Sequence, residues 1–254
     1  MPGFFGVNNV LASDTVYTTP SANINADFLP AVDNRTSTVY LFSHVGILPA
    51  VIEINLSAPA EVNFFGIARH TLGDSGITGL GVEYFDGVTW QPFAAPIITT
   101  SNRPILVNVE TPVIAQAWRL TITDPLPNNE IGFFMLGLGV VIPRISAPHD
   151  FIGYSRQKKI INGANNTAWL GSYSRNENPG LQITLKDYLP EVLDPIQNQI
   201  IDFISYSPFF YSYRDDLTSQ DFKALLVAEG QPNLSMFKNI CLKDWMIKTK
   251  VLDG

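Results

Sequence analysis

The stretch between Val51 and Pro143 decides the fold. It contains, in chain order, VIEINLSAPAEVNFFGIARH (residues 51–70), VEYFDGVTW (82–90), WRLTITD (118–124) and IGFFMLGLGVVIP (131–143). Each segment is rich in β-branched and aromatic residues, and Pro, Gly or Asp–Gly turn signals lie between them. Many short strands, with turn signals about every ten residues, are typical of a β-sandwich or barrel.

Local patterns support this interpretation. In Val51–Leu56 apolar and polar residues alternate, which predicts a half-buried strand. Pro59 is expected to end that strand, and the more uniformly apolar Val62–Ala68 fits a second strand in a central position. The dipeptide Asp86–Gly87 suits the type I′ turn of a β-hairpin.

The composition is unusual for its low charge. Charged residues make up 15% of the chain and hydrophobic residues 46%, whereas about 25% charged residues is usual in soluble globular proteins. Low charge is compatible with a subunit that hides surface against neighbours. It is equally compatible with an ordinary sandwich whose surface is polar but uncharged.

The charges divide the chain into two parts. Residues 1–145 contain no lysine, and their five arginines face eleven acids, whereas the remainder carries all eight lysines and a net charge of −1. We therefore expect an extended N-terminal arm (1–22), a jelly-roll sandwich (23–145) and a second β-rich domain (146–254). Neither part is basic enough for a nucleic-acid binder.

The second part combines strand and helix signals. Asp194–Pro195 resembles a helix N-cap followed by proline at the first helical position, which predicts a short helix near residues 195–205. Phe222, Leu225 and Leu226 at helical spacing, followed by Gly230, predict another near residues 219–230. The expected fold class is thus mostly β with one or two short helices.

Several classes of protein are disfavoured. The single cysteine, Cys241, excludes an internal disulfide and a multi-cysteine metal site. The N-terminus has neither the basic nor the long apolar segment of a secretory signal. The longest apolar run, Ile131–Pro143, is shorter than the ~20 residues of a membrane-spanning helix. We expect no membrane and no nucleic-acid partner.

The order of strands resembles the galactose-binding-like, discoidin-type jelly roll. Ile52–Leu56, Gly66–Leu72 with Gly76, and the hairpin Phe85–Trp90 carry this likeness. Such a resemblance implies a sandwich used for sugar binding or as a rigid spacer in large assemblies.

The two-part order also resembles bacteriophage tail and baseplate minor structural proteins. The same segments carry the resemblance, together with Ser207–Tyr211 in the second part. Arg69 and Thr71 depart from the family pattern, which has Gly and Asn there. The resemblance implies a non-enzymatic virion subunit of the tail tip, baseplate or neck, which binds other virion proteins and copies of itself. The alternative is a carbohydrate-binding module that recognises glycans of the host surface.

Three residues are candidates for ligand binding: His70, Trp90 and Arg119. His70 ends a strand beside a Gly-rich loop, and Trp90 flanks the hairpin turn as a platform on which a sugar ring would stack. The alternative for His70 is a loop histidine bonded to the backbone, and for Trp90 a core position.

The sequence contains few signals of a catalytic or metal-binding site. No Gly-x-Ser-x-Gly elbow, His-Glu-x-x-His or EF-hand loop occurs, so no catalytic residue and no cofactor is expected. A structural calcium ion remains a candidate, with Asp33 and Asp74 as ligands by their place in loops.

The aromatic residues after Pro208 form a candidate interface. They are Phe209, Phe210, Tyr211 and Tyr213. Tyr and Phe supply contact area with few rotatable bonds, which favours protein–protein contacts. The alternative is a well-filled core of the second domain.

Overall fold

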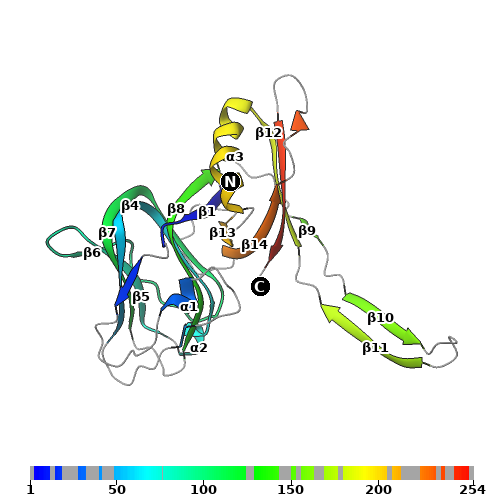
Figure 1. Ribbon diagram of the computed structural model, residues 1–254, viewed down its shortest axis with the longest axis horizontal. Coiled ribbons are helices and arrows are strands. Elements are labelled where there is room, and N and C mark those ends of the chain that lie inside the picture. Colours follow the sequence, from blue (N-terminus) through cyan, green and yellow to red (C-terminus); the bar gives the residue numbers. More distant parts are fainter. Residues whose placement is uncertain are drawn as a thin grey trace.

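The computed structural model shows a mostly β protein (Figure 1). It describes residues 3–11, 15–18, 28–32, 40–41, 49–75, 77–123, 129–142, 150–152, 156–162, 169–176, 180–204, 208–212, 224–232, 236–237 and 243–251. Within these residues no helix is long and apolar enough to cross a membrane.

Two long strands organise the N-terminal part. β4 (Ala50–His70) and β7 (Ile105–Thr123) run antiparallel to each other and bend together. Because of the bend, each strand belongs to one layer of a sandwich in its first half and to the other layer in its second half.

The first layer contains the start of β4 and the end of β7. β2 pairs with β4 on one side, and β5 and then β6 extend the layer beyond β7. The added strands are β2 (Val16–Thr18), β5 (Gly79–Phe85) and β6 (Trp90–Pro92).

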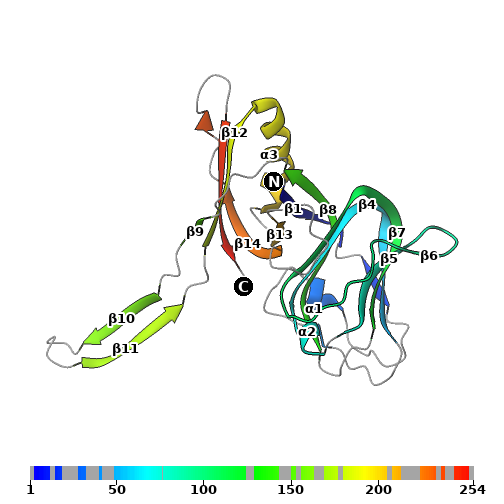
Figure 2. The same ribbon diagram turned by 180° about the vertical axis from the view of Figure 1, so that it is seen from behind.

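The second layer contains the end of β4 and the start of β7. β8 pairs with β4, and both β3 and β1 pair with the free side of β8. These strands are β8 (Glu130–Ile142), β3 (Tyr40–Leu41) and β1 (Gly3–Asn9). The short helices α1 (Leu29–Val32) and α2 (Leu72–Ser75) lie beside this layer (Figure 2). The two layers form the jelly-roll sandwich that the sequence predicts.

The core of the sandwich confirms the predicted alternation. Ile52, Ile54 and Leu56 are buried in it, while the residues between them are half exposed. Trp118 from the first layer and Phe134 from the second are both fully buried in the same cluster. The apolar segment at the end of β4 is central, as predicted, since it pairs with both β7 and β8.

Two details of the sandwich correct the sequence-based expectation. Pro59 does not end the strand: β4 continues as one element, and the pairing with β7 skips from Asn55 to Ala60. Proline is tolerated there because it lies in a bulge, where its missing N–H breaks no ladder hydrogen bond. Gln116 lies opposite, and its Nε2 donates to the backbone oxygen of Leu56 at 3.1 Å.

The hairpin turn is also different from type I′. Asp86 N–H donates to Thr89 O at 3.1 Å, so Gly87 and Val88 are the central residues of the turn. Gly87 alone has a positive φ, of 99°, whereas type I′ requires it at both central positions. The Asp86 carboxylate accepts hydrogen bonds from the amides of Val88 and Thr89, each at 2.8 Å, which stabilises this turn.

The sheet does not stop at the sandwich. β1 pairs with β8 on one edge and with β13 (Phe209–Ser212) on the other, so the second layer continues into the C-terminal part. The further order is β13, β14, β16, β12 and β9. In the described residues of the expected N-terminal arm, β1 and β2 both pair with strands of their own chain. The expected border between residues 145 and 146 lies outside the described residues, and the division into domains stays a prediction.

The remaining strands of the C-terminal sheet are short to medium in length. They are β9 (Asp150–Ile152), β12 (Gly180–Tyr188), β14 (Ala224–Pro232), β15 (Met236–Phe237) and β16 (Lys243–Val251). β16 pairs with β12, β14 and β15, so it is a central strand of this sheet.

The core of the C-terminal part includes residues of the N-terminal part. The amphipathic helix α3 (Pro190–Ile204) lies over the sheet and buries Leu193 and Ile200 against it. The same cluster contains Phe5 and Val7 from β1 and the end of β8. The C-terminal part therefore has no described core that is entirely its own.

The first predicted helix is confirmed with an earlier start, and the second is wrong. α3 begins at Pro190 rather than at Pro195, which lies inside the helix; Pro190 is the proline that occupies the first turn. The second predicted helix, residues 219–230, is wrong where it is described, because its end forms strand β14 between β13 and β16. A short apolar run such as Leu225–Val227 fits either structure by periodicity, and pairing on both edges decides for the strand.

A third hydrophobic cluster covers the face of the continuous sheet that lies opposite the face covered by α3. Phe4 and Phe64 meet edge to face at 5.6 Å between ring centroids, and Phe133 and Phe210 lie 5.8 Å apart. A Cβ at Gly66 would lie 2.4 Å from the ring of Phe210, although three strand pairings separate β4 from β13. The sheet therefore curls strongly, and the glycine makes room for a ring from the far strand.

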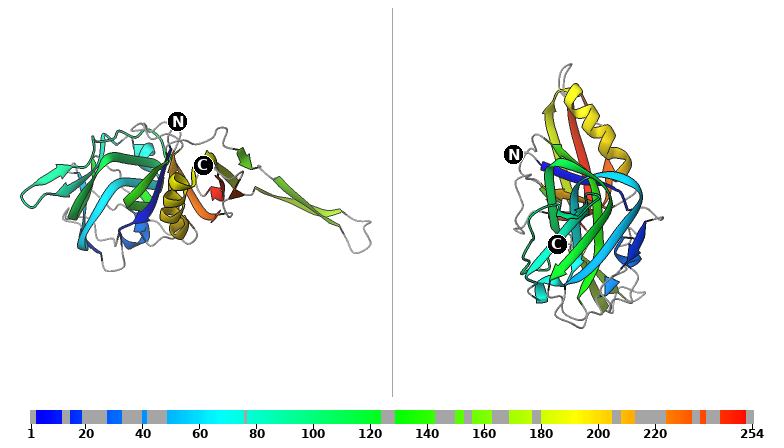
Figure 3. Two further views of the ribbon diagram at one scale, coloured as in Figure 1. Left: turned by 90° about the horizontal axis from the view of Figure 1, so that it is seen from above. Right: turned by 90° about the vertical axis from the view of Figure 1, so that its left-hand side faces the viewer.

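One element stands apart. β10 (Arg156–Asn162) and β11 (Trp169–Asn176) form a separate two-stranded sheet. In Figures 1 and 3 this hairpin extends away from the rest of the protein.

Candidate functional site

The outer face of the first layer carries a row of aligned residues from β5 and β7. Thr123 lies opposite Gly79, Thr121 opposite Gly81, and Arg119 opposite Glu83. Directly opposed residues of an antiparallel pair share one face of the sheet. The buried residues between them, such as Val82, point into the core of the sandwich.

The chain after β6 returns along the free edge of β5. Phe93 N–H donates to Val82 O at 2.9 Å, and Leu80 and Ile97 exchange two backbone hydrogen bonds of 2.7 Å. Pro92 ends β6 and Pro96 belongs to the returning segment; proline is tolerated at both because an edge position needs no N–H on its outer side.

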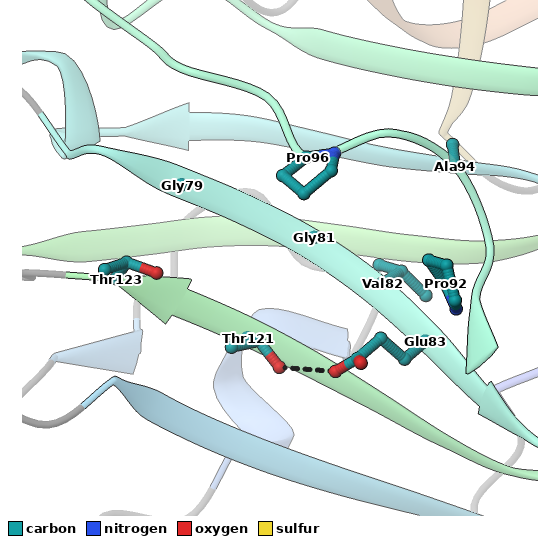
Figure 4. A pocket seen from close by; sticks show the side chains of 9 residues that line it. All are labelled: Gly79, Gly81, Val82, Glu83, Pro92, Ala94, Pro96, Thr121 and Thr123. Carbon is teal, nitrogen blue, oxygen red and sulfur yellow. Dashed lines mark hydrogen bonds between the residues drawn. The ribbon is translucent and has the colours of Figure 1, made fainter. Parts of the chain in front are cut away.

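These elements enclose a shallow trough on the outer face. Its volume is about 170 Å³, and Figure 4 shows the threonines on one side of β5 and the proline-containing segment on the other. The lining residues are Gly79, Gly81, Val82, Glu83, Pro92, Ala94, Pro96, Thr121 and Thr123.

The floor of the trough is made by two glycines. A Cβ at Gly79 would lie 3.2 Å from Thr123 Oγ1, but a Cβ at Gly81 would meet no described atom within 4 Å. Gly81 also lacks a positive φ, so neither packing nor backbone conformation requires glycine there. Glycine inside a strand often marks a close approach by a ligand or another backbone. Its effect here is to keep the trough open.

An ion pair closes one end of the trough. Arg119 donates from Nε to Glu83 Oε2 at 2.6 Å and from Nη2 to Glu83 Oε1 at 3.0 Å, and Thr121 Oγ1 donates to Oε2 at 3.1 Å. The hydrogen bonds from Arg119 hold the pKa of Glu83 below its usual value. Arg119 has five donors and Glu83 engages two of them.

Trp90 lies next to this ion pair. The guanidinium of Arg119 lies over the indole ring, 4.6 Å from its centroid, and Phe85 packs against the same indole at 5.4 Å. Trp90 is half exposed, and Phe85 is 36% exposed. The structure thus brings two of the three predicted ligand residues, Trp90 and Arg119, into contact.

The third, His70, has a structural position. Its side chain is 2% exposed, its Nδ1 accepts from Leu72 N–H at 3.3 Å, and its Nε2 lies 2.7 Å from Arg103 O. An accepting Nδ1 places the proton on Nε2, which then donates to that carbonyl. His70 pairs with Ile131 in the second layer, away from the trough strands. The prediction of a ligand role for His70 is therefore replaced by its alternative, a histidine bonded to the backbone.

The structure describes one of the two candidate calcium ligands. Asp74 is exposed and accepts from Asn102 Nδ2 at 2.8 Å, while Asp33 lies outside the described residues. The part of the chain that the structure describes contains no cluster of acidic, histidine or cysteine side chains suited to a metal ion.

The candidate interface residues are buried inside their own chain. Phe209 and Tyr211 face the core beneath α3, and Phe210 enters the opposite cluster, each with at most 1% exposed surface. Neighbouring side chains of a strand point to opposite faces, and both faces of this sheet are covered here. The interface prediction is corrected for these three residues, and Tyr213 lies outside the described ones.

Four residues of the trough were not among the predicted site residues: Gly79, Gly81, Glu83 and Thr121. A signal was present, since Gly79, Gly81 and Glu83 alternate with buried residues along one strand. It was not recognised because the register of β5 with β7, and hence the threonines opposite the glycines, is set only in the folded sheet.

Several known structures with a similar fold are carbohydrate-binding modules. They include the family 32 module of NanJ from Clostridium perfringens, in complex with galactose (17% identity, 52% of this chain, 98% of that chain, TM-score 0.43). A mutant form of chitosan-binding module 1, from a chitosanase/glucanase of Paenibacillus sp. IK-5, shares 18% identity over 51% of this chain and 98% of its own, with a TM-score of 0.40.

A family 32 module of EndoD from Streptococcus pneumoniae is similar as well, at 14% identity over 51% of this chain and 98% of that chain, with a TM-score of 0.39. No protein-family model matches the chain, and no curated protein matches it. The resemblance to bacteriophage tail and baseplate proteins finds no support in these comparisons.

Proposed function

We propose that this protein binds carbohydrate in the trough on the outer face of the sandwich. The observation that carries the proposal is Gly81, a glycine in the middle of a strand whose side-chain position opens into the trough. Substitution there would fill the site while leaving the packing of the sandwich unchanged.

The walls of the trough match the chemistry of a sugar ring. Pro92, Ala94 and Pro96 offer apolar surface to the C–H groups of the ring, while Thr121 and Thr123 offer hydroxyl groups that donate and accept. Binding sites for small molecules commonly combine apolar walls with a few well-placed polar groups. The volume of about 170 Å³ lies below the range of roughly 300–1,000 Å³ for drug-sized ligands, which favours one sugar residue.

The charged groups favour a neutral ligand. Glu83 and Arg119 neutralise each other, and the arginine keeps N–H donors that the carboxylate does not engage. A sugar hydroxyl accepts such a donor without introducing an unpaired charge. Trp90 extends the apolar surface beyond the ion pair.

We propose binding without catalysis. Glycoside hydrolysis commonly needs two carboxyl groups, one of them with a raised pKa. Glu83 is the single acidic residue in the lining, and its pKa is lowered rather than raised.

A glycan array followed by calorimetry with the best glycan tests the proposal. Filling the trough with Gly81→Val, and more completely with Gly81→Phe, should weaken binding progressively, while Gly81→Ala should have the smallest effect. Asn55→Val provides the matched control, since it places the same valine on the outer face of the same layer outside the trough.

Removing the hydrogen-bond donors of Arg119 gives a second test of glycan binding. Arg119→Met should weaken binding about tenfold or more, as expected for a hydrogen bond from a charged group. The proposal fails if the wild-type protein binds no glycan. It also fails if Gly81→Phe binds as tightly as wild type at unchanged thermal stability.

A bacteriophage virion subunit remains the second candidate function, with the virion as its location. The low charge of the chain and the hairpin that extends from its body favour an assembly role. Mass spectrometry and antibody labelling of purified particles would detect such a subunit, and its absence from the particles would exclude this role.

A further inference from the structure

The hairpin β10–β11 is the least integrated element of the protein. Its strands pair with each other from Arg156 opposite Asn176 to Asn162 opposite Trp169, and with no other strand of the described sheet. Seen from two directions in Figures 1 and 3, it points away from both the sandwich and the C-terminal sheet.

Such an element is incomplete by itself. An isolated two-stranded hairpin is marginally stable in water. Each of its strands also leaves one edge of unpaired N–H and C=O groups, which readily bind another surface. The hairpin is therefore expected to become ordered against a partner.

The charge of the hairpin differs in sign from the charge of the rest of the chain. Residues 156–176 contain Arg156, Lys158, Lys159 and Arg175 and no acidic residue, which gives +4. Since the whole chain has a net charge of −7, the rest carries −11. A basic arm on an acidic body is complementary to the body of another copy.

The sandwich offers exposed carboxylates for this contact. Glu61 and Glu110 both lie in the irregular part of the β4–β7 ladder, where Glu61 is opposite Ile114 and residues 109–112 face the single residue Asn63. Both glutamates are exposed, and neither has a hydrogen-bond or ion-pair partner among the described residues. Ile114 beside them is 71% exposed and adds apolar surface.

We propose that the β10–β11 hairpin of one copy docks onto the acidic sandwich of a second copy, with Glu61 and Glu110 in the contact. In a two-fold dimer each copy donates one hairpin and receives one, so that the contact closes on itself. This inference does not rest on glycan binding, because the trough and the bend are different surfaces.

A polyanion such as nucleic acid is the competing partner for a basic hairpin. The acidic body disfavours it, since the charge of −11 on the same molecule repels a polyanion near the hairpin. A second copy presents acidic groups to the hairpin. Because the hairpin extends from the body, the two acidic bodies need not touch over a large area.

Sedimentation velocity of the full chain tests the proposal across concentration and salt. At 50 mM salt we expect concentration-dependent formation of a species of twice the 28.1 kDa chain mass. At 0.5–1 M salt its association constant should fall by about tenfold or more, because salt screens the charges. The double variant Lys158→Glu/Lys159→Glu should remain monomeric at 50 mM salt.

Two further variants separate a specific contact from net charge. Arg69→Glu/Arg103→Glu changes the net charge by the same amount on the sandwich, where both side chains are exposed, and should preserve or strengthen association. Glu61→Lys/Glu110→Lys should weaken it, and mixing this variant with Lys158→Glu/Lys159→Glu should restore a mixed dimer.

Three results would overturn the proposal. The first is a wild-type protein that stays monomeric at 50 mM salt and high concentration. The second is a dimer that the Lys158→Glu/Lys159→Glu variant forms as well as wild type does. The third is a monomer that binds heparin or duplex DNA through Lys158 and Lys159, which would assign the hairpin to a polyanion instead.

Discussion

The sandwich and the C-terminal part of this protein are both β-sheets, but they obtain their cores differently. The sandwich closes two layers over a cluster drawn entirely from residues 11–136. The C-terminal part has one sheet and one helix, and its core includes Phe5, Val7 and Ile142 from strands that also belong to the sandwich. We infer that the second part depends on the first for folding, whereas the sandwich depends less on the second.

Removing residues 1–9 should have the largest effect on the folding of the C-terminal part. Without β1 the strand β13 loses one of its two neighbouring strands, and the cluster under α3 loses two buried residues. We expect hydrogen exchange to show lost protection in β12, β13 and β16, while the amides of β5 and β7 stay protected. Unchanged protection in β16 would contradict the proposed dependence.

Phe5→Ala tests, with a single side chain, whether the C-terminal part depends on β1 for its stability. Phe5 is fully buried between Phe209 and Tyr211, with ring centroids 5.7 and 4.9 Å away. The change should cost about 3–5 kcal/mol of the stability of the C-terminal part. In urea titration monitored by exchange, that part should unfold first. Phe65→Ala, in the sandwich core, is the control and should destabilise the whole protein together.

Two glycine substitutions compare a packed position with an open one. Gly66→Ala would force a Cβ against the ring of Phe210, at 2.4 Å in the present geometry, and should destabilise by about 1–3 kcal/mol. Gly81→Ala meets open space and should be neutral or stabilise by up to about 1 kcal/mol. Thermal unfolding of both variants measures the difference, and equal effects would contradict it.

Removing the ion pair between Glu83 and Arg119 should change the free energy of unfolding least. Because the folded-state pKa of Glu83 is lowered, its contribution to stability is present above the unfolded pKa of about 4.5 and is lost as the pH falls through the lower folded value. The side chains are 24% and 27% exposed, so Glu83→Gln should cost less than about 1 kcal/mol at pH 7. The cost should be smaller at pH 3 than at pH 7, as measured by urea unfolding at both pH values.

Much of the fold was predictable because its signals are local. The alternation in Val51–Leu56 and the turn residues around Asp86 need only neighbouring positions to be recognised. Arg69 lies at a φ of 52°, in the left-handed region that favours glycine.

The errors lie where distant segments meet. Residues 224–230 have a helical apolar spacing but become a strand, because β13 and β16 pair with both of their edges. His70 and the aromatic residues of β13 have the composition of functional residues, but burial gives them structural positions. Trp90 and Arg119 were found by residue type, whereas the trough beside them depends on register.

The sequence by itself determined a mostly β chain, an N-terminal jelly roll and a basic segment in an acidic protein, because composition and periodicity act over a few residues. Only the tertiary structure decided that β1 joins the two parts, that Gly81 opens a trough between Thr121 and Pro92, and that the basic segment extends from the body. These features depend on pairings between residues far apart in the chain, and the free energy of such pairings is set by the whole folded sheet rather than by any local pattern.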